Sequence, residues 1–262
     1  MLKDITLGQY FPTGSVLHKL DPRLKIILVF AIVFVTFMAK TTLDYAILFA
    51  FIVIIAWLSK VPLSMYLKSL KPMLILIAFT AILNLFLTPG EVVWSWWFLK
   101  ATKEGAILGA YMLCRIVLLI MASSILTYTT SPLQLTAGLE SLMKPLKYLK
   151  FPSHEVAMMM TIALRMIPVI LEETEKIMKA QQVRGANFTS GGLIERAKAL
   201  IPILIPLFIS SFRRADELAT AMEARCYNGG EGRTSLNTPH FKICDIWATS
   251  ICVIVLGSLW FI

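Results

Sequence analysis

Hydrophobic positions gather in five stretches of the chain that approach the length of a membrane span. They are Leu24–Ala39, Tyr45–Leu58, Pro72–Leu87, Ala106–Leu126 and Ile246–Ile262. A helix needs about 17–25 predominantly apolar residues to cross the hydrocarbon core of a bilayer, so the second stretch is short. The pattern predicts an all-α membrane protein with about five transmembrane helices, four of them in the first half of the chain.

The interval between the fourth and fifth stretches has a different pattern. It is too charged for a series of spans, and its apolar residues recur at helical spacing. It predicts two long amphipathic helices, Pro152–Gln182 and Leu193–Tyr227, after a shorter one at Leu133–Leu149 that begins at Ser131-Pro132. We therefore predict three parts: an N-terminal membrane domain at 1–127, a cytoplasmic module of long helices at 128–242 and a C-terminal transmembrane helix at 243–262.

The first long helix is expected to carry its charges away from its apolar face. The pairs Glu172–Lys176 and Glu175–Lys179 lie one turn apart, where ion pairs within one helix are favourable. Pro168 lies inside the same stretch and removes one backbone donor, so we expect a bend there.

The second long helix has an apolar face and a row of small residues. Its expected apolar face consists of Ile194, Ala197, Ile201, Leu204, Phe208, Leu218 and Met222. Pro202 and Pro206 are expected to distort its middle, and Arg213 can pair with Glu217 across one turn. Ser211, Ala215 and Ala219 form a small-residue ridge that either admits another helix closely or reflects ordinary helix packing.

Composition and charge support a membrane location and indicate an orientation. Hydrophobic residues make up 57% of the 262 positions and the mean hydropathy is +0.74, above what a soluble domain shows. We interpret the net charge of +9 as an indication of membrane topology rather than of nucleic-acid binding, because Lys and Arg collect on the cytoplasmic side of membranes. Basic residues before the first stretch and between the second and third place both segments in the cytoplasm: Lys19, Arg23, Lys25, Lys60, Lys68 and Lys71. Trp94, Trp96 and Trp97 place the loop after the third stretch at the outer membrane surface.

Two arginines end the long helices in nearly matching phrases. Residues 180–185 read AQQVRG and residues 221–226 read AMEARC, and each phrase is followed by chain that disfavours a helix. A single arginine at a helix end is explained by the helix dipole, worth about 0.3–1 kcal/mol. Two matched arginines with small neighbours favour docking onto two similar acceptors of another protein. The candidate docking residues are Arg184, Arg225, Val183, Gly185, Ala224 and Cys226.

The sequence carries no clear catalytic or metal-binding motif. Its four cysteines form no C-x-x-C pair and its three histidines are scattered, so neither a zinc site nor a disulfide framework is predicted. The glycine-rich segment 229–235 lacks the spacing and the lysine of a phosphate-binding loop. Glu172, Glu173 and Glu175 are explained as salt-bridged, solvent-facing positions rather than as a catalytic cluster.

Ionisable residues and methionines bear on the type of transporter. The five stretches contain no acidic residue and show no internal duplication, which weighs against a secondary carrier. Arg115, near the middle of the fourth stretch, is the main ionisable residue within the five stretches and requires a partner there. Met158, Met159, Met160 and Met166 cluster at the start of the first long helix, where they either fill gaps in a core or contact an exchangeable membrane partner.

Three motifs together resemble the transmembrane T component (EcfT/CbiQ-type) of energy-coupling factor (ECF) transporters. Residues 14–25, GSVLHKLDPRLK, resemble the N-terminal signature of that family, and residues 180–186 and 221–234 resemble its two arginine motifs. The resemblance covers essentially the whole chain. It departs from the family at Cys226, where Gly or Ser is common, and at Val183, where Ala is more usual.

The resemblance implies a non-catalytic coupling subunit of an ABC-class importer for a vitamin or a metal ion. In that family two cytoplasmic ATPases bind the arginine motifs on two crossed coupling helices, and a separate small membrane protein, the S subunit, captures the substrate. By this analogy Arg184 and Arg225 each enter a groove on one ATPase. The chain itself is expected to bind no cofactor, because ATP and Mg are held by the ATPases.

Two other functions stay open at this point. A stand-alone secondary transporter or channel is the main alternative, and a membrane-embedded enzyme acting on lipids is the third. The expected location is the prokaryotic plasma membrane, with a cytoplasmic N-terminus and a cytoplasmic long-helix module. Neither of the other two functions requires a matched pair of helix-end arginines.

Overall fold

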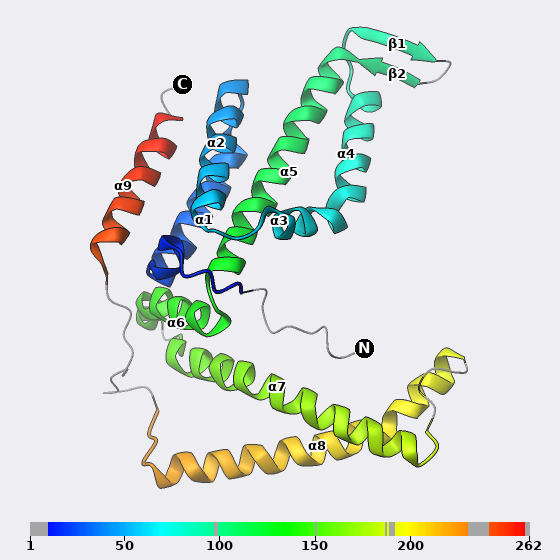
Figure 1. Cartoon of the computed structure of the whole chain (residues 1–262), viewed down its shortest axis with the longest axis vertical. Coiled ribbons are helices and arrows are strands. Elements are labelled where there is room, and N and C mark those ends of the chain that lie inside the picture. Colours follow the sequence, from blue (N-terminus) through cyan, green and yellow to red (C-terminus); the bar gives the residue numbers. More distant parts are fainter. Residues whose placement is uncertain are drawn as a thin grey trace. The chain divides into compact units, whose positions relative to one another are not determined.

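The computed structural model describes residues 10–96, 99–149, 151–186, 188, 192–229 and 241–259. Residue contacts divide the chain into two compact units. Among the described residues, those between 10 and 138 and 241–259 belong to the membrane-helix unit, and those between 139 and 229 belong to the long-helix unit. Helices dominate the described residues of both units, so the predicted all-α membrane fold is confirmed (Figure 1).

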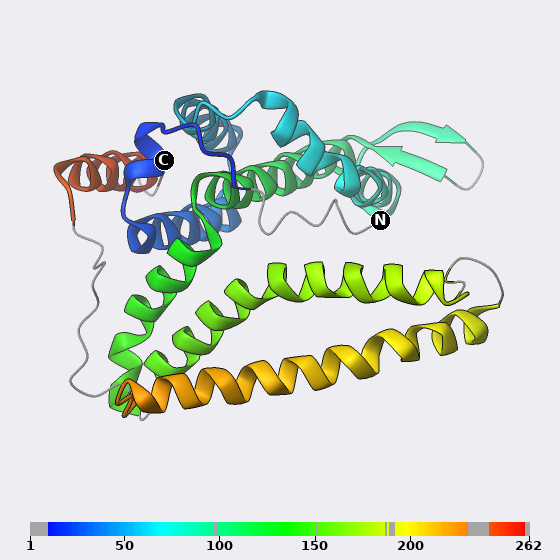
Figure 2. The same ribbon diagram turned by 60° about the horizontal axis from the view of Figure 1, so that its bottom comes forward.

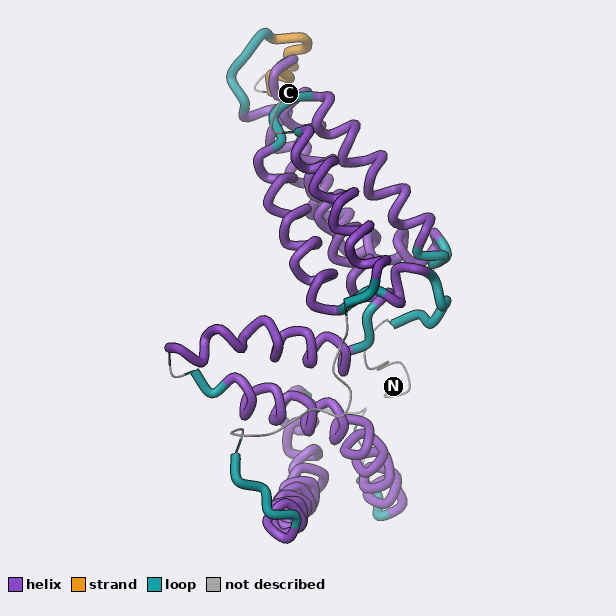
Figure 3. The backbone as a smooth tube through the Cα atoms, turned by 90° about the vertical axis from the view of Figure 1, so that its left-hand side faces the viewer, coloured by secondary structure: helices purple, strands orange, loops and turns teal. Residues whose placement is uncertain are grey.

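The membrane-helix unit is a bundle whose main helices run side by side (Figure 3). Its helices are α1 (Pro22–Met38), α2 (Thr42–Leu58), α3 (Leu63–Leu70), α4 (Leu74–Leu87), α5 (Lys103–Thr129) and α9 (Ile243–Ser258). Two short 3-10 turns, Val16–Lys19 and Lys71–Met73, precede α1 and α4. Each of the five predicted stretches coincides with one of these helices, although residues 260–262 of the last lie outside the described residues.

Local capping explains where the first two helices begin. Asp21 accepts a hydrogen bond from the backbone N–H of Arg23, and Pro22 occupies the first helical position of α1. At the start of α2, Thr41 and Asp44 bond each other's backbone N–H groups in a capping box. Both signals lie directly before an apolar run, which fixes the polar boundary of each helix.

Helix α5 is the centre of the bundle and contacts α1, α2, α3 and α4. Leu48 and Ile52 of α2 and Leu118 of α5 are completely buried in this core. The contact with α4 is close at Gly105, where a Cβ atom would lie 2.5 Å from the carbonyl oxygen of Asn84. A larger side chain at this position would push α4 away from α5.

Three helical stretches of the described residues are long and apolar enough to cross a membrane. They are Leu63–Leu87, α5 and α7 (Ser153–Val183), judged by length and composition, while α2 and α9 are shorter apolar helices. The candidacy of α7 was not predicted, since its sequence reads as amphipathic. Its hydropathy is 1.5, against 2.1 for the other two, and its second half carries Glu172, Glu173 and Glu175. The apolar part of α7 is therefore its first half.

The segment between α4 and α5, predicted as a loop, contains a β-hairpin. Strand β1 (Val92–Trp96) pairs antiparallel with β2 (Leu99–Thr102), with an irregularity between Val92 and Trp94. The β-branched and aromatic residues of β1 suit a strand. Trp97, one of the tryptophans predicted to face the outer membrane surface, lies outside the described residues.

The long-helix unit is built on α7 and α8 (Leu193–Ala224), which contact each other and run in opposite directions (Figures 1 and 2). Helix α6 (Pro132–Met143) leads into the unit, begins at the predicted Ser131-Pro132 and is followed by the 3-10 helix Lys144–Leu149. Both long helices stay continuous through their internal prolines. At 1.5 Å per residue each is about 46–48 Å long.

Candidate functional site

The end of α7 is closed by a glycine in the left-handed conformation. Arg184 is the C-cap residue of α7, and Gly185 follows it with a φ of 90°. The N–H of Gly185 donates to the carbonyl of Gln182, and the N–H of Ala186 donates to the carbonyl of Gln181. This pair of bonds is a Schellman motif, which satisfies carbonyls at the end of the helix.

The end of α8 repeats this motif bond for bond. Arg225 occupies the position of Arg184, and Cys226 follows with a φ of 57°. The N–H of Cys226 donates to the carbonyl of Glu223, and the N–H of Tyr227 donates to that of Met222. The similarity of the two phrases in sequence is therefore a similarity in backbone structure. Residues 230–234 of the second motif lie outside the described residues.

Both arginines are exposed together with their neighbours. The six predicted docking residues Val183, Arg184, Gly185, Ala224, Arg225 and Cys226 are all exposed, and Val183 is 89% accessible. Within the described ranges, no side-chain hydrogen bond or ion pair engages either guanidinium. Each arginine therefore offers its five donors outward from a backbone that the Schellman motif fixes.

The two arginines lie at opposite ends of the α7–α8 pair. Because α7 and α8 run in opposite directions, the C-terminal end of one lies far from the C-terminal end of the other (Figures 1 and 2). This arrangement separates the two docking ends and presents each to a different region of space.

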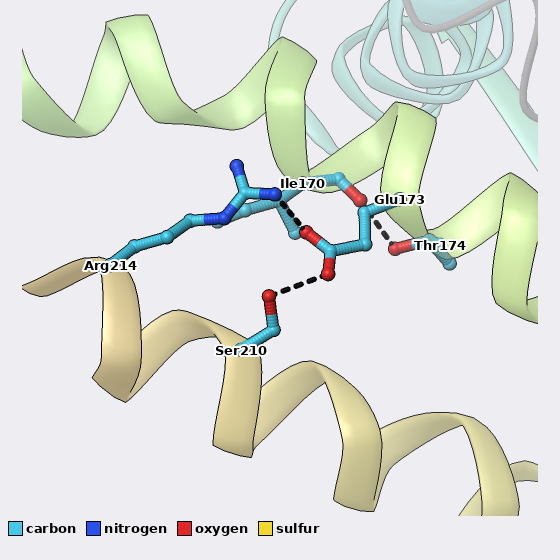
Figure 4. Close-up of polar contacts among 5 residues, drawn as sticks. All are labelled: Ile170, Glu173, Thr174, Ser210 and Arg214. Atoms are coloured by element: carbon cyan, nitrogen blue, oxygen red, sulfur yellow. Dashed lines mark hydrogen bonds and ion pairs between the residues drawn. The ribbon is translucent and has the colours of Figure 1, made fainter.

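The two helices are joined between these ends by a polar contact that was not predicted. Glu173 of α7 accepts hydrogen bonds from the hydroxyl of Ser210 at 2.5 Å and from the guanidinium of Arg214 at 2.5 Å (Figure 4). Among the described residues, the ion pairs within 4.0 Å are this one and Glu140–His154.

The ion pairs predicted within single helices are absent from the described residues. The pairs Glu172–Lys176, Glu175–Lys179 and Arg213–Glu217 do not form there, because side chains that reach water gain little by pairing. Glu173, expected to face solvent, instead contacts the neighbouring helix. Periodicity placed Glu173 among three similar glutamates, and only the packing of α8 distinguishes it from them.

Comparison with known proteins gives a consistent family. The family model CbiQ, described as a cobalt transport protein, matches residues 13–236. The chain is 56% identical to the energy-coupling factor transporter transmembrane protein EcfT of Acidaminococcus fermentans, over 90% of this chain and 88% of the relative. It is 53% identical to that of Ruminiclostridium cellulolyticum and 45% identical to that of Bacillus subtilis, over at least 96% of each chain. The chain belongs to the CbiQ/EcfT family of ECF transporter transmembrane proteins.

In this ECF family member the methionines predicted to contact a partner lie partly on the surface of α7. Met159 and Met160 are exposed, at 58% and 38%, whereas Met158 and Met166 are half-buried. All four belong to the more apolar first half of the helix. Flexible methionine side chains exposed there suit contact with an apolar partner.

Helix α8 buries a different stripe from the one that the sequence indicated. Ile203 is buried, and Leu207, Ser210, Arg214 and Leu218 are half-buried. In contrast, most of the predicted apolar face is exposed: Ile194, Ile201, Leu204 and Phe208, while the side chain of Ala197 lies outside the description. The apolar face that the sequence indicated is therefore left largely exposed in the single chain, apart from Leu218 and Met222. Phe212, Ile205 and Ile209 extend the exposed apolar surface.

Arg115, the charged residue of α5, has partners within the membrane-helix unit. Its guanidinium donates to the carbonyl of Ala39 at 3.1 Å and to the hydroxyl of Tyr45 at 2.8 Å. It also lies 5.9 Å from the ring centroids of Phe37 and Tyr45, within range of a cation–π interaction. Because Ala39 ends α1, Arg115 has a structural role in joining three helices.

Proposed function

We propose that this chain is the coupling scaffold of an ECF-type importer, linking two cytoplasmic ATPases to a substrate-capturing membrane subunit. The observation that carries the proposal is the pair of matching Schellman-capped helix ends, each presenting an exposed arginine at one end of the α7–α8 pair. Membership of the ECF transporter family supports it. The transported substrate is a vitamin or a metal ion.

Each helix end is suited to enter a groove on one ATPase. Arginine keeps its charge at any working pH and donates in a rigid fork that fits carboxylates and carbonyls. Gly185 and Ala224 add little bulk beside the arginines, so a partner surface can approach their backbones. In this proposal Arg184 binds one ATPase and Arg225 binds the other, with Val183 and Cys226 at the rim.

The basic residues of the membrane-helix unit support a cytoplasmic position for the long helices. With the N-terminus in the cytoplasm, α1, α2, α4 and α5 return the chain to the cytoplasmic side before α6 begins. The apolar first half of helix α7 suits contact with an apolar partner, and its charged second half suits contact with the ATPases. Helix α9 crosses the membrane last.

The apolar surfaces of the long helices are the proposed contact with the S subunit. Exposed apolar surfaces are formed by Met159 and Met160 on α7 and by the exposed isoleucines and phenylalanines on α8. Such surfaces are typical of contact sites for another protein or for lipid. Met158 and Met166 lie beside them, half-buried. Flexible methionines allow more than one S subunit to bind in turn.

The chain itself is proposed to be non-catalytic. ATP and Mg are bound by the partner ATPases, whose closure moves the ends of α7 and α8. The chain converts this movement into a change at the surface that holds the S subunit. Differential binding of the two ATPase states to the two helix ends supplies the free energy for this change.

Co-purification of the chain with the ATPases of its own organism tests the proposal. Arg184→Ala and Arg225→Ala should each weaken retention of an ATPase by about 2–5 kcal/mol, the usual cost of truncating one member of a charged contact, and the double variant should lose both. Arg213→Ala is the matched control, since Arg213 is an exposed arginine on α8 away from either end.

Two results would contradict this function. One is normal ATPase retention and normal ATP-driven uptake by the double variant. The other is uptake driven by an ion gradient in proteoliposomes that contain this chain alone, which would instead support a secondary transporter or channel.

A further inference from the structure

The contact of Glu173 with α8 uses both carboxylate oxygens. Oε1 accepts from Ser210 and Oε2 accepts from Arg214, and these two residues are one helical turn apart on the same face of α8 (Figure 4). The carboxylate therefore bridges two successive turns of the neighbouring helix. We call Glu173, Ser210 and Arg214 the crossing clamp.

The crossing clamp lies at equivalent positions of the two helices. Glu173 precedes Arg184 by eleven positions, and Arg214 precedes Arg225 by eleven positions. At 1.5 Å per residue, each arginine is about 16 Å along its helix from the clamp. Because the helices run in opposite directions, the two arms extend from the clamp to opposite sides.

The crossing clamp is the part of the α7–α8 contact that requires a particular geometry. The side chains of Arg214 and Glu173 are 37% and 23% exposed, so both are partly shielded from water, whereas Glu172 and Arg213 nearby are exposed. The other half-buried residues on this face of α8 include Leu207 and Leu218, and the burial of apolar side chains is stabilising without being directional. Charge-assisted hydrogen bonds do have a preferred geometry.

We propose that the crossing clamp is the pivot about which α7 and α8 turn when the ATPases move their ends. Held at two turns of α8, α7 resists sliding along its neighbour, because a slide would break both hydrogen bonds. A displacement of one arginine then rotates the helix about the clamp. Arms of equal length give the two ATPases the same leverage. Glu173, Ser210 and Arg214 are positioning residues in this proposal, which rests on the proposed function.

Distance measurements between the two helix ends test this role. Nitroxide labels are attached to Lys179→Cys and Thr220→Cys, exposed positions just before the two arginine motifs, in a chain whose native cysteines are replaced, with Cys226→Gly at the left-handed position. Double electron–electron resonance then gives the distance distribution for the complete complex with ATPases and S subunit, with and without ATP. The same labels are measured on the chain alone in nanodiscs.

The clamp variants have a defined expected result. Glu173→Gln and Arg214→Ala should keep both ATPases, because the arginine ends are intact. Each should broaden the distance distribution at least twofold, so that the change in distance on ATP binding is no longer well defined. Glu172→Gln is the matched control and should behave like the unmodified chain. The exchange of charges in Glu173→Arg with Arg214→Glu should restore a narrow distribution.

Three outcomes would overturn the pivot. They are an unchanged width and ATP shift in both single variants, a loss of ATPases as severe as in the arginine variants, and a charge exchange that restores nothing. A merely structural role would lower the yield of folded chain without changing the distribution in the part that assembles. If the unmodified chain retains no ATPase, the proposed function fails instead, and the nanodisc measurement still tests the clamp.

Discussion

The membrane-helix unit and the long-helix unit differ in what surrounds their cationic side chains. In the first, Lys25 is buried and donates to the carbonyl of Thr129 at 3.0 Å, and Arg115 donates to the end of α1. In the second, Arg184 and Arg225 are exposed and have no side-chain partner among the described residues. Residues of one chemical type thus stabilise the fold in one unit and stay available for another protein in the other.

The N-terminal signature takes part in a second buried polar contact of the membrane-helix unit. Asp245 of α9 is completely buried and accepts from the backbone N–H of Asp21 at 2.9 Å and from that of Lys242 at 2.7 Å. It joins the start of α1 to the start of α9, which is more than two hundred residues away in the sequence. The motif that helped to indicate the family is therefore a structural junction, whereas the arginine motifs are exposed.

Removing this junction should give the largest loss of stability. Asp245→Ala leaves the buried N–H of Asp21 and the partly exposed N–H of Lys242 without an acceptor, and we expect a loss of about 3 kcal/mol in the free energy of unfolding. Thermal unfolding in detergent measures it. Asp245→Asn keeps one acceptor oxygen and should lose less. The folded fraction of either variant should retain ATPases normally, and a selective loss of ATPases would contradict the division between the two units.

A smaller loss is expected at Arg115. Tyr45→Phe removes the hydroxyl that accepts from Arg115 and that also donates to the carbonyl of Ala39 at 3.3 Å. Hydrogen bonds to charged groups are worth about 1.5–3 kcal/mol, so we expect a loss of about 2 kcal/mol in the free energy of unfolding. The measurement is again thermal unfolding of the purified chain.

Tyr111 provides a matched control for this substitution. Its ring stacks on that of Tyr45 at 5.2 Å, and its hydroxyl bonds the exposed Thr42 at 2.8 Å. Because water can replace an exposed partner, Tyr111→Phe should cost only about 0.5 kcal/mol. Equal losses in the two variants would show that Arg115 gains nothing from the hydroxyl of Tyr45.

The sequence predicted the helices better than it predicted their contacts. Apolar runs and periodicity located α1, α2, α4, α5, α7, α8 and α9, because a helix imposes its period on the sequence locally. The matched breakers after Arg184 and Arg225 located two helix ends that have the same backbone structure. These features depend on neighbours in sequence, which are visible without a structure.

Contacts between helices could not be predicted in the same way. Glu173 differs from Glu172 and Glu175 only in facing α8, and the register of that packing is not encoded in the spacing of α7 itself. The exposure of most of the apolar face of α8 could not be predicted for a related reason. Periodicity finds an apolar stripe but does not distinguish a stripe that packs within the chain from one left for a partner.

A small effect is expected at the position after each arginine, where one helix end has Gly185 and the other has Cys226. Gly185 adopts its φ of 90° without steric cost, whereas Cys226 holds a φ of 57° that disfavours a residue with a Cβ atom. Cys226→Gly should therefore raise the free energy of unfolding of the long-helix unit by about 1 kcal/mol, and Gly185→Ala should lower it by about 1 kcal/mol.

Open space around Gly185 makes this a test of backbone conformation alone. An added Cβ there would meet no atom within 4 Å, so crowding does not contribute to the effect of Gly185→Ala. Hydrogen exchange at the amides of Ala186 and Tyr227, which close the two Schellman motifs, measures the stability of each end separately. Higher protection of the Tyr227 amide in Cys226→Gly and lower protection of the Ala186 amide in Gly185→Ala would confirm that both ends form the same motif, which glycine stabilises. Equal protection in all variants would show that Cys226 carries no strain.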